Sequence, residues 1–179
     1  MAPWRPLRAR SPAALVLLSL AACGYHPVYA AGPPGRLHVA LVRTLVADPV
    51  AADEVAAGVR EELAKAGALG AGEGYPRVEV EVLRADESSE GVAAGPGGPV
   101  ARGTGVGIVA RAWVAPAPGE GEQMSDTGDV RAEETVRVDP SALASGFHHA
   151  DALRAAARRL GHALGARILG LPAASEEGP

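Results

Sequence analysis

Residues 77–84 read RVEVEVLR, and this short stretch decides the fold class. Val78, Val80 and Val82 fall on one side of an extended chain, and charged residues fall on the other. Successive side chains of a β-strand point to opposite faces of the sheet, so the pattern predicts a strand with one buried and one solvated face. We therefore expect a sheet that other elements cover on one side only.

Three other stretches are predicted to be strands of the same sheet. Residues 37–46 are apolar with alternating Val and Leu, and residues 104–114 carry Val, Ile and Ala on one face. Residues 130–138 also alternate, except that Glu134 falls on the apolar side. Each of these stretches is typical of a half-buried strand.

Two stretches have the spacing of amphipathic helices. The first begins at Asp48-Pro49, since Asp accepts hydrogen bonds from free backbone amides and Pro is preorganised for the first turn. It is expected to end at Gly67. The second, residues 151–171, places its apolar side chains on one face at steps of three and four. These side chains are Leu153, Ala157, Leu160, Leu164, Ile168 and Leu171.

The predicted order is strand, helix, three strands, helix, with loops at 85–103 and 115–128 that are rich in Gly and Pro. The first strand and its helix suit a parallel pairing, and the later strands suit antiparallel pairing. We expect an α+β fold: a two-layer α/β sandwich with two helices on one face of a four-stranded mixed sheet. This single domain should span 37–172, followed by a disordered tail at 173–179.

Residues 1–22 are typical of a secretory signal peptide that is removed from the mature protein. Arginines without any acidic residue come first, and the apolar run at 13–22 is too short to span a bilayer. The run ends in LAAC at 20–23, which resembles a bacterial lipobox, in which the cysteine takes a lipid and becomes the first residue. A plain secretory signal followed by an incidental cysteine is the alternative.

Cys23 is the only cysteine of the chain, which excludes an internal disulfide. We expect a covalent lipid on Cys23, a tether at 23–36 and no other cofactor. Gly24 follows the cysteine, whereas an Asp at this place in lipoproteins tends to retain the protein at the inner membrane. The expected location is therefore the outer membrane, with the domain lipid-anchored on the periplasmic side.

The charge balance excludes one class of partner. Removing residues 1–22 takes away three of the 17 Lys and Arg and none of the 21 Asp and Glu. An acidic domain binds nucleic acid poorly, so no nucleic-acid partner is expected. The sequence has no Gly-x-Ser-x-Gly, no His-Glu-x-x-His and no cysteine pair, so we expect neither an enzyme nor catalytic residues.

Three weaker patterns each have two interpretations. Residues 103–107 (GTGVG) resemble a phosphate loop in glycine count alone, and glycines that permit a bulge or a close backbone approach are favoured. His148, His149 and His162 suggest a metal site, but no carboxylate is spaced to complete the ligand set, so no metal is expected. Trp113 falls on the outward face of its strand, as a partner contact or as a structural residue at the sheet edge.

Residues 23–26 read Cys-Gly-Tyr-His and resemble the Cys-Gly-aromatic-His run of the LPS-assembly lipoprotein family, LptE. The order of elements, the long glycine-containing connection after the second strand, and the closing helix ADALRAAARRLGHALGARIL at 150–169 are also similar to that family. The chain departs from it at Pro27, where many members have a hydrophobic residue. It also departs at residues 103–107, where members usually have bulkier side chains.

The resemblance implies a lipid-anchored outer-membrane subunit of the lipopolysaccharide translocon. Such a subunit plugs and supports the LptD barrel and helps to deliver lipopolysaccharide to the cell surface. The implied partners are an LptD-like outer-membrane β-barrel, lipopolysaccharide, and the membrane through the lipid anchor. An auxiliary lipoprotein of an ABC-type envelope lipid transporter, or another envelope scaffold, is the alternative, and a lipid-anchored enzyme is the third hypothesis.

Lipopolysaccharide carries phosphates, so a subunit that binds it needs cations. This protein is acidic overall, so those cations must form a local group. Arg102, Arg111 and Arg131 are predicted to lie on or beside the outward face of two neighbouring strands. Guanidinium groups match the oxygens of phosphate, so these arginines are the candidate ligand-binding residues. The alternative is that they pair across the sheet with glutamates such as Glu81 or Glu133.

Overall fold

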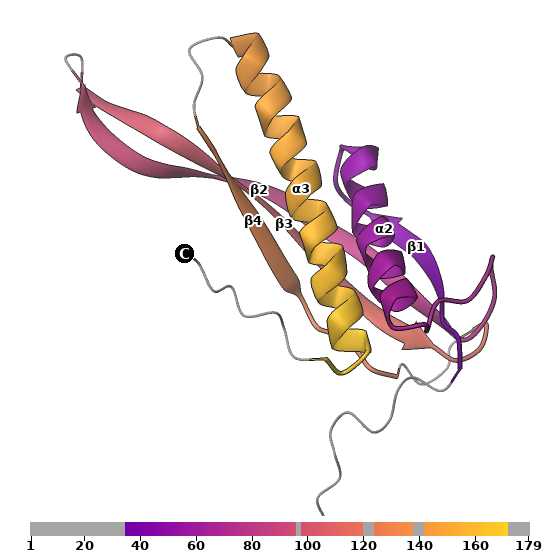
Figure 1. Cartoon of the computed structure of the whole chain (residues 1–179). Helices are drawn as coiled ribbons and strands as arrows, with labels where there is room; N and C mark the ends of the chain where they lie inside the picture. The colour runs from indigo at the N-terminus through magenta and orange to yellow at the C-terminus, as the bar shows by residue number, and fades with distance from the viewer. Residues whose placement is uncertain (1–34, 96–97, 120–123, 138–141, 172–179) are drawn as a thin grey trace, which may run out of the picture. The chain divides into compact units, whose positions relative to one another are not determined.

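The computed structural model describes residues 35–95, 98–119, 124–137 and 142–171. The elements are β1 (His38–Thr44), α2 (Pro49–Lys65), β2 (Arg77–Gly95), β3 (Gly98–Ala115), β4 (Val130–Arg137) and α3 (Ala142–Ile168). Both helices lie on the same face of the sheet (Figure 1). The predicted α+β class, element order and two-layer arrangement are confirmed. The predicted signal peptide, Cys23 and the C-terminal tail lie outside the described residues.

The sheet has the order β1-β2-β3-β4 and is mixed, as the sequence predicts. β1 runs parallel to β2, with His38 opposite Arg77, and α2 makes the crossover between them. The other two pairings are antiparallel. Two register shifts interrupt the ladders, between Leu41 and Arg43 on β1 and between Val82 and Arg84 on β2.

The helix α2 begins where its capping residues predict. The carboxylate of Asp48 accepts hydrogen bonds from the amides of Val50 (2.9 Å) and Ala51 (3.2 Å), and Pro49 follows it directly. These bonds satisfy amides that have no partner inside the helix. Beyond the last turn, Gly67 has φ +68°, a left-handed conformation that glycine adopts without strain.

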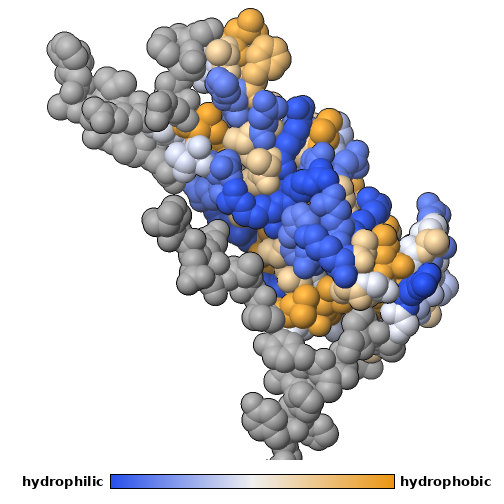
Figure 2. Space-filling model, in the orientation of Figure 1, coloured by the Kyte–Doolittle hydropathy of each residue, from blue (hydrophilic) through white to orange (hydrophobic). Residues whose placement is uncertain are grey.

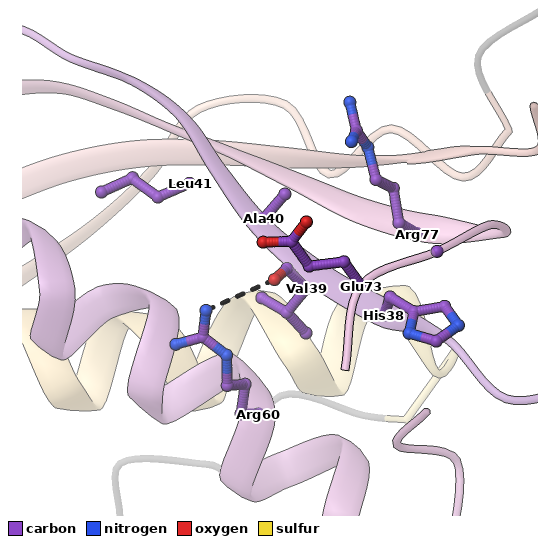
Figure 3. A pocket seen from close by; sticks show the side chains of 8 residues that line it. His38, Val39, Ala40, Leu41, Arg60, Glu73 and Arg77 are labelled. Carbon is purple, nitrogen blue, oxygen red and sulfur yellow. Dashed lines mark hydrogen bonds between the residues drawn. The ribbon is translucent and has the colours of Figure 1, made fainter. Parts of the chain in front are cut away.

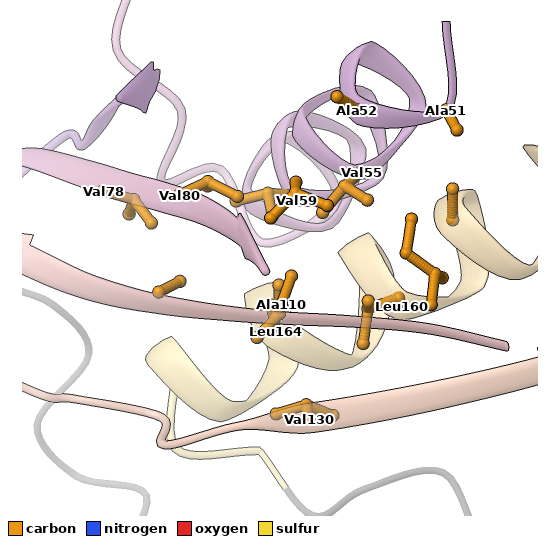
Figure 4. Packing of buried hydrophobic residues seen from close by; sticks show 14 of the residues in the cluster. Ala51, Ala52, Val55, Val59, Val78, Val80, Ala110, Val130, Leu160 and Leu164 are labelled. Carbon is orange, nitrogen blue, oxygen red and sulfur yellow. The ribbon is translucent and has the colours of Figure 1, made fainter. Parts of the chain in front are cut away.

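The core lies between the inner face of the sheet and the two helices (Figure 4). Because alternate residues of β2 point inward, Val78, Val80 and Val82 are fully buried. They share the core with side chains from both helices and from the neighbouring strands. The larger of these are Val55, Val59, Leu63, Val106, Ile108, Leu160 and Leu164.

The two helices meet at glycine. A Cβ added to Gly161 of α3 would lie 2.2 Å from the carbonyl oxygen of Val55, and one added to Gly58 of α2 would lie 2.4 Å from the carbonyl oxygen of Arg158. Real Cβ atoms do not approach backbone so closely. The two helix backbones can therefore approach this closely only because both contact residues are glycines without a side chain.

The loop predicted at 85–103 is wrong. β2 continues to Gly95 and β3 begins at Gly98, so most of this segment is a two-stranded antiparallel ladder. β4 reaches only the part of β3 from Gly103 onward. A ladder is held by backbone hydrogen bonds, so it continues where the sequence has no alternating apolar residues. The segment was predicted as a loop because it is rich in glycine.

The predicted start of the last helix at Asp151 is also wrong, because α3 begins at Ala142. The first turns carry Leu143 and Phe147 on the solvent side, so they add nothing to the apolar stripe that marks the rest of the helix. The predicted stripe is buried from Leu153 to Ile168. Leu171 is not part of it, since the helix ends at Ile168 and the Leu171 side chain is exposed.

Candidate functional site

The outward face of the sheet carries charged side chains in rows that cross the strands. Glu81 is the clearest case, because it is only 4 % exposed although it points away from the helices. Its carboxylate lies 3.3 Å from the guanidinium of Arg43 on β1 and 2.6 Å from that of Arg111 on β3. Arg111 donates its hydrogen bonds to Glu81, and this pairing raises the pKa of Arg111 above its usual value. Two neighbouring arginines thus cover the carboxylate and neutralise it.

A second row lies further along the same face. Arg131 of β4 donates to Asp86 of β2 at 2.7 Å and to Glu133 at 3.0 Å. Its guanidinium crosses β3 over Gly107, where a Cβ would lie 2.5 Å from Nη2. The glycine was expected to permit a close approach, and it does so for this side chain.

The carboxylate of Asp86 is the acidic centre of that row. A hydrogen bond from Arg84 first, and one from Arg131 after it, hold the pKa of Asp86 below its usual 3.8, against an opposing effect of desolvation. A lowered folded-state pKa stabilises the fold at pH above the unfolded-state value. This contribution is lost as the pH falls from about 3.8 through the lower folded-state pKa.

Trp113 lies on the outward face as predicted, on the part of β3 beyond Ala110, where pairing with β4 has ended and an isolated bridge joins Val114 to Met124. Its indole Nε1 donates to Glu79 at 3.0 Å, and the same carboxylate accepts from Arg77 at 2.5 Å. Arg111 lies over the indole ring at 5.8 Å from its centroid. The ring is therefore fixed in the polar network of this face.

The structure describes the side chains of two of the three predicted phosphate-binding arginines. Arg111 lies opposite Glu81, and Arg131 lies opposite Val109, two residues along the strand from Arg111, so both arginines are on the same face. Each already binds a carboxylate, which is the pairing that the alternative interpretation expected. The backbone of Arg102 belongs to β3, and its side chain is outside what the structure describes.

The histidines are spread over the structure. His149 lies 3.4 Å from Glu87 of β2, while His162 lies 3.2 Å from both Glu61 and Glu62 of α2. Within the described ranges no three His, Cys, Asp or Glu side chains are grouped as metal ligands would be. Residues 103–107 form part of β3.

The solvent side of the helices is strongly hydrophilic (Figure 2). Arg158 of α3 bridges to α2 by pairing with Glu54 at 2.7 Å and with Glu61. Hydrophobic residues gather instead at the N-terminal end of α3, where Leu143 is 73 % and Phe147 65 % exposed. In the part of the chain that the structure describes, neither helix has the length and apolar character needed to cross a bilayer.

A cavity of about 270 Å³ lies beside β1 (Figure 3). It is lined by His38, Val39, Ala40, Leu41, Arg60, Glu73, Gly74 and Arg77. Arg60 reaches across from α2 and donates to the carbonyl oxygen of Val39 at 3.3 Å. Sequence reasoning missed this site, because nothing in the spacing of Arg60 and Glu73 indicates that they flank the same strand.

The fold has counterparts among solved structures. A minor lipoprotein from Acinetobacter baumannii superposes with a TM-score of 0.51 at 9% identity, over 76% of this chain and 92% of that one. The fold is one that a bacterial lipoprotein has. A protein assigned as a lipoprotein from Caulobacter crescentus CB15 has a TM-score of 0.49 at 13% identity, covering 70% of this chain and 85% of its own. The rare lipoprotein B from Shewanella oneidensis has a TM-score of 0.40 at 14% identity, covering 71% and 90%.

No protein-family model and no curated protein matches the sequence. At such low identity the likeness concerns the lipoprotein fold alone. Which residues of that fold bind a partner has to be argued from this chain's own side chains.

Proposed function

We propose that the chain is a non-enzymatic, lipid-anchored outer-membrane subunit of a lipopolysaccharide translocon that supports an LptD-like barrel. The observation that carries the proposal is the element order β-α-β-β-β-α with both helices on one face, which is the order that the resemblance to LptE predicts. The Cys-Gly-Tyr-His run at 23–26 and the lipoprotein fold of the Acinetobacter protein support it.

A scaffold role suits the chemistry of the described surfaces. The outward sheet face and the boundary between α2 and α3 carry networks of paired charges. In them Glu81, Asp86 and Arg158 each have two partners. Because these charges already have partners, the polar lining of a barrel can contact them without leaving a charge unpaired. A rigid two-layer domain presents them in fixed positions.

The direct test is co-purification. The full chain, tagged at its C-terminus, is expressed with the LptD-like barrel of the same organism and extracted from outer membranes in detergent. We expect the two chains to elute together. Elution with a periplasmic ABC-type transporter instead of the barrel would favour the alternative lipoprotein class.

The anchor gives a separate prediction. Since Cys23 supplies the only thiol, Cys23→Ala should abolish acylation and leave uncleaved precursor or soluble protein. Mass spectrometry of the mature N-terminus measures this, with Ser19→Ala inside the apolar run as the control that should still be acylated. An unmodified wild-type N-terminus at another residue would contradict the lipobox interpretation.

The arginine group remains a candidate for binding lipopolysaccharide phosphate. Arg111 and Arg131 must exchange a carboxylate for phosphate, so their ion pairs oppose binding. If they bind, the Ala variant of Arg102, Arg111 and Arg131 loses affinity for purified lipopolysaccharide, and the loss shrinks at higher salt. Unchanged affinity with an intact fold rejects the site and leaves the scaffold role standing.

A further inference from the structure

One edge of the sheet is open, and its backbone geometry can be read from the hydrogen bonds of β1. The amide of His38 donates to Pro76 at 3.0 Å, toward β2. Leu37 faces the other way, since its amide donates to Ala68 at 2.7 Å and its carbonyl accepts from Gly70 at 2.8 Å. Successive residues of a strand alternate in direction, so Val39 and Leu41 also point their amides and carbonyls away from β2.

Beyond Leu37, the described residues supply one hydrogen bond to this outer edge. It comes from Arg60, whose Nη2 donates to the carbonyl oxygen of Val39 at 3.3 Å (Figure 3). The guanidinium stands where the amide of a further strand would stand. The cavity beside Val39, Ala40 and Leu41 leaves space along the strand at this place.

Apolar side chains of the core are also left partly exposed along this edge. Val39 and Leu41 pack against the core but are only partly buried, whereas Ile108, Ala110 and Ala112 on the inner strand β3 are fully buried. Toward the far end of β1 Val42 is 43 % exposed, and just beyond the strand Leu45 is 58 % exposed. A strand laid beside β1 would cover these apolar side chains.

The opposite edge also receives a hydrogen bond from a helix arginine, but its strand carries charged side chains of its own. Arg159 of α3 donates to the carbonyl oxygen of Glu133 at 3.2 Å, as Arg60 does to that of Val39, and it also pairs with the carboxylate of Glu134. This pairing also explains why Glu134 breaks the apolar alternation of its strand. Sheets commonly guard their edges with such charges. On β1 Arg43 pairs with Glu81 on the outward face, whereas residues 39–42 read VALV and carry no charge.

We propose that the outer edge of β1 binds an extended segment of a protein partner by β-strand addition. The segment fits the site if it has apolar residues at alternate positions and a carboxylate that meets Arg60, for which the described residues provide no acidic partner. Backbone bonds to Val39 and Leu41 supply the affinity, and Arg60 sets the register. The inference rests on the proposed function in taking the barrel subunit as that partner.

The test is residue-resolved amide exchange on the full chain, free and in the purified complex with the LptD-like barrel. In the free chain the amides of His38 and Ala40, which bond to β2, should exchange slowly, and those of Val39 and Leu41 quickly. In the complex we expect Val39 and Leu41 to slow by about tenfold or more. Side-chain burial alone does not produce protection at alternate amides.

A variant pair tests the same edge by affinity. Val42→Lys places a charge on the open edge, and we expect it to weaken binding to the barrel about tenfold or more without changing the melting temperature. Val50→Lys on α2 is the matched control, because Val50 is 44 % exposed and Val42 43 %. It should leave the affinity unchanged.

The outcomes separate the two proposals. If the wild-type complex forms but Val39 and Leu41 stay unprotected, or Val42→Lys binds as tightly as wild type, strand addition is overturned and the translocon role stands. If wild type forms no complex with the barrel, both proposals fail together.

Discussion

Gly161→Ala should destabilise the fold by about 1–3 kcal/mol, although alanine is the better helix former by about 1 kcal/mol. The new Cβ would lie 2.2 Å from the carbonyl oxygen of Val55 and 2.9 Å from the Cα of Gly58. Both are backbone atoms of α2, so no side chain can rotate away and the helices must separate. Denaturant unfolding of the purified domain measures the loss.

Gly146→Ala is the matched control, because it makes the same change in the same helix. No atom lies within 4 Å of a Cβ added at Gly146, so only the helix propensity should act. We expect this variant to gain about 0.5–1 kcal/mol. A gain of stability at both glycines would show that the helices do not meet as closely as described. A loss at both would mean that the cost at Gly161 cannot be assigned to its contact with α2.

Leu160→Ala should cost about 2–5 kcal/mol, the range for truncating a fully buried leucine. Leu160 is 0 % exposed and lies in the centre of the core cluster, between the sheet and α2. Its neighbours in the cluster are side chains of the sheet and of a closely packed helix, which cannot collapse far into a cavity, so we expect the upper half of that range.

Leu143→Ala provides the comparison within α3. The side chain of Leu143 is 73 % exposed, so its truncation should change the free energy of unfolding by less than about 0.5 kcal/mol. Thermal or urea unfolding of both variants decides the matter. Equal, small losses at the two leucines would mean that the inward face of α3 is assigned wrongly.

The sequence predicts the layers of this fold because its strongest patterns report burial. The alternation of Val78, Val80 and Val82 and the stripe around Leu160 are both consequences of one buried face, and both are found. The outer ladder of β2 and β3 is Gly-rich in sequence, and the first turns of α3 expose Leu143 and Phe147, so neither carries such a pattern. Their boundaries were therefore missed.

The candidate sites could be predicted less well. The charge pattern indicated an outward row of arginines and glutamates, and Arg111 pairs with Glu81 as one interpretation held. Which guanidinium crosses to which strand depends on register, and the bulge near Arg84 shifts that register. The open edge of β1 depends on strand order, which no local pattern encodes.

The strand pairings differ in the length of chain that they close into a loop, and this difference bears on the order in which the chain folds. β2 and β3 pair as far as Gly95 and Gly98, where pairing closes the shortest loop, so their ladder can form from this end toward Arg77. β1 can join only after α2 has bridged the gap from His38 to Arg77, so its pairing closes a longer loop at once. We expect the ribbon of β2 and β3 to form first in folding and β1 to join it later. Pulsed labelling during refolding should therefore protect the amide of Glu79, which points to β3, before that of Ala40, which points to β2.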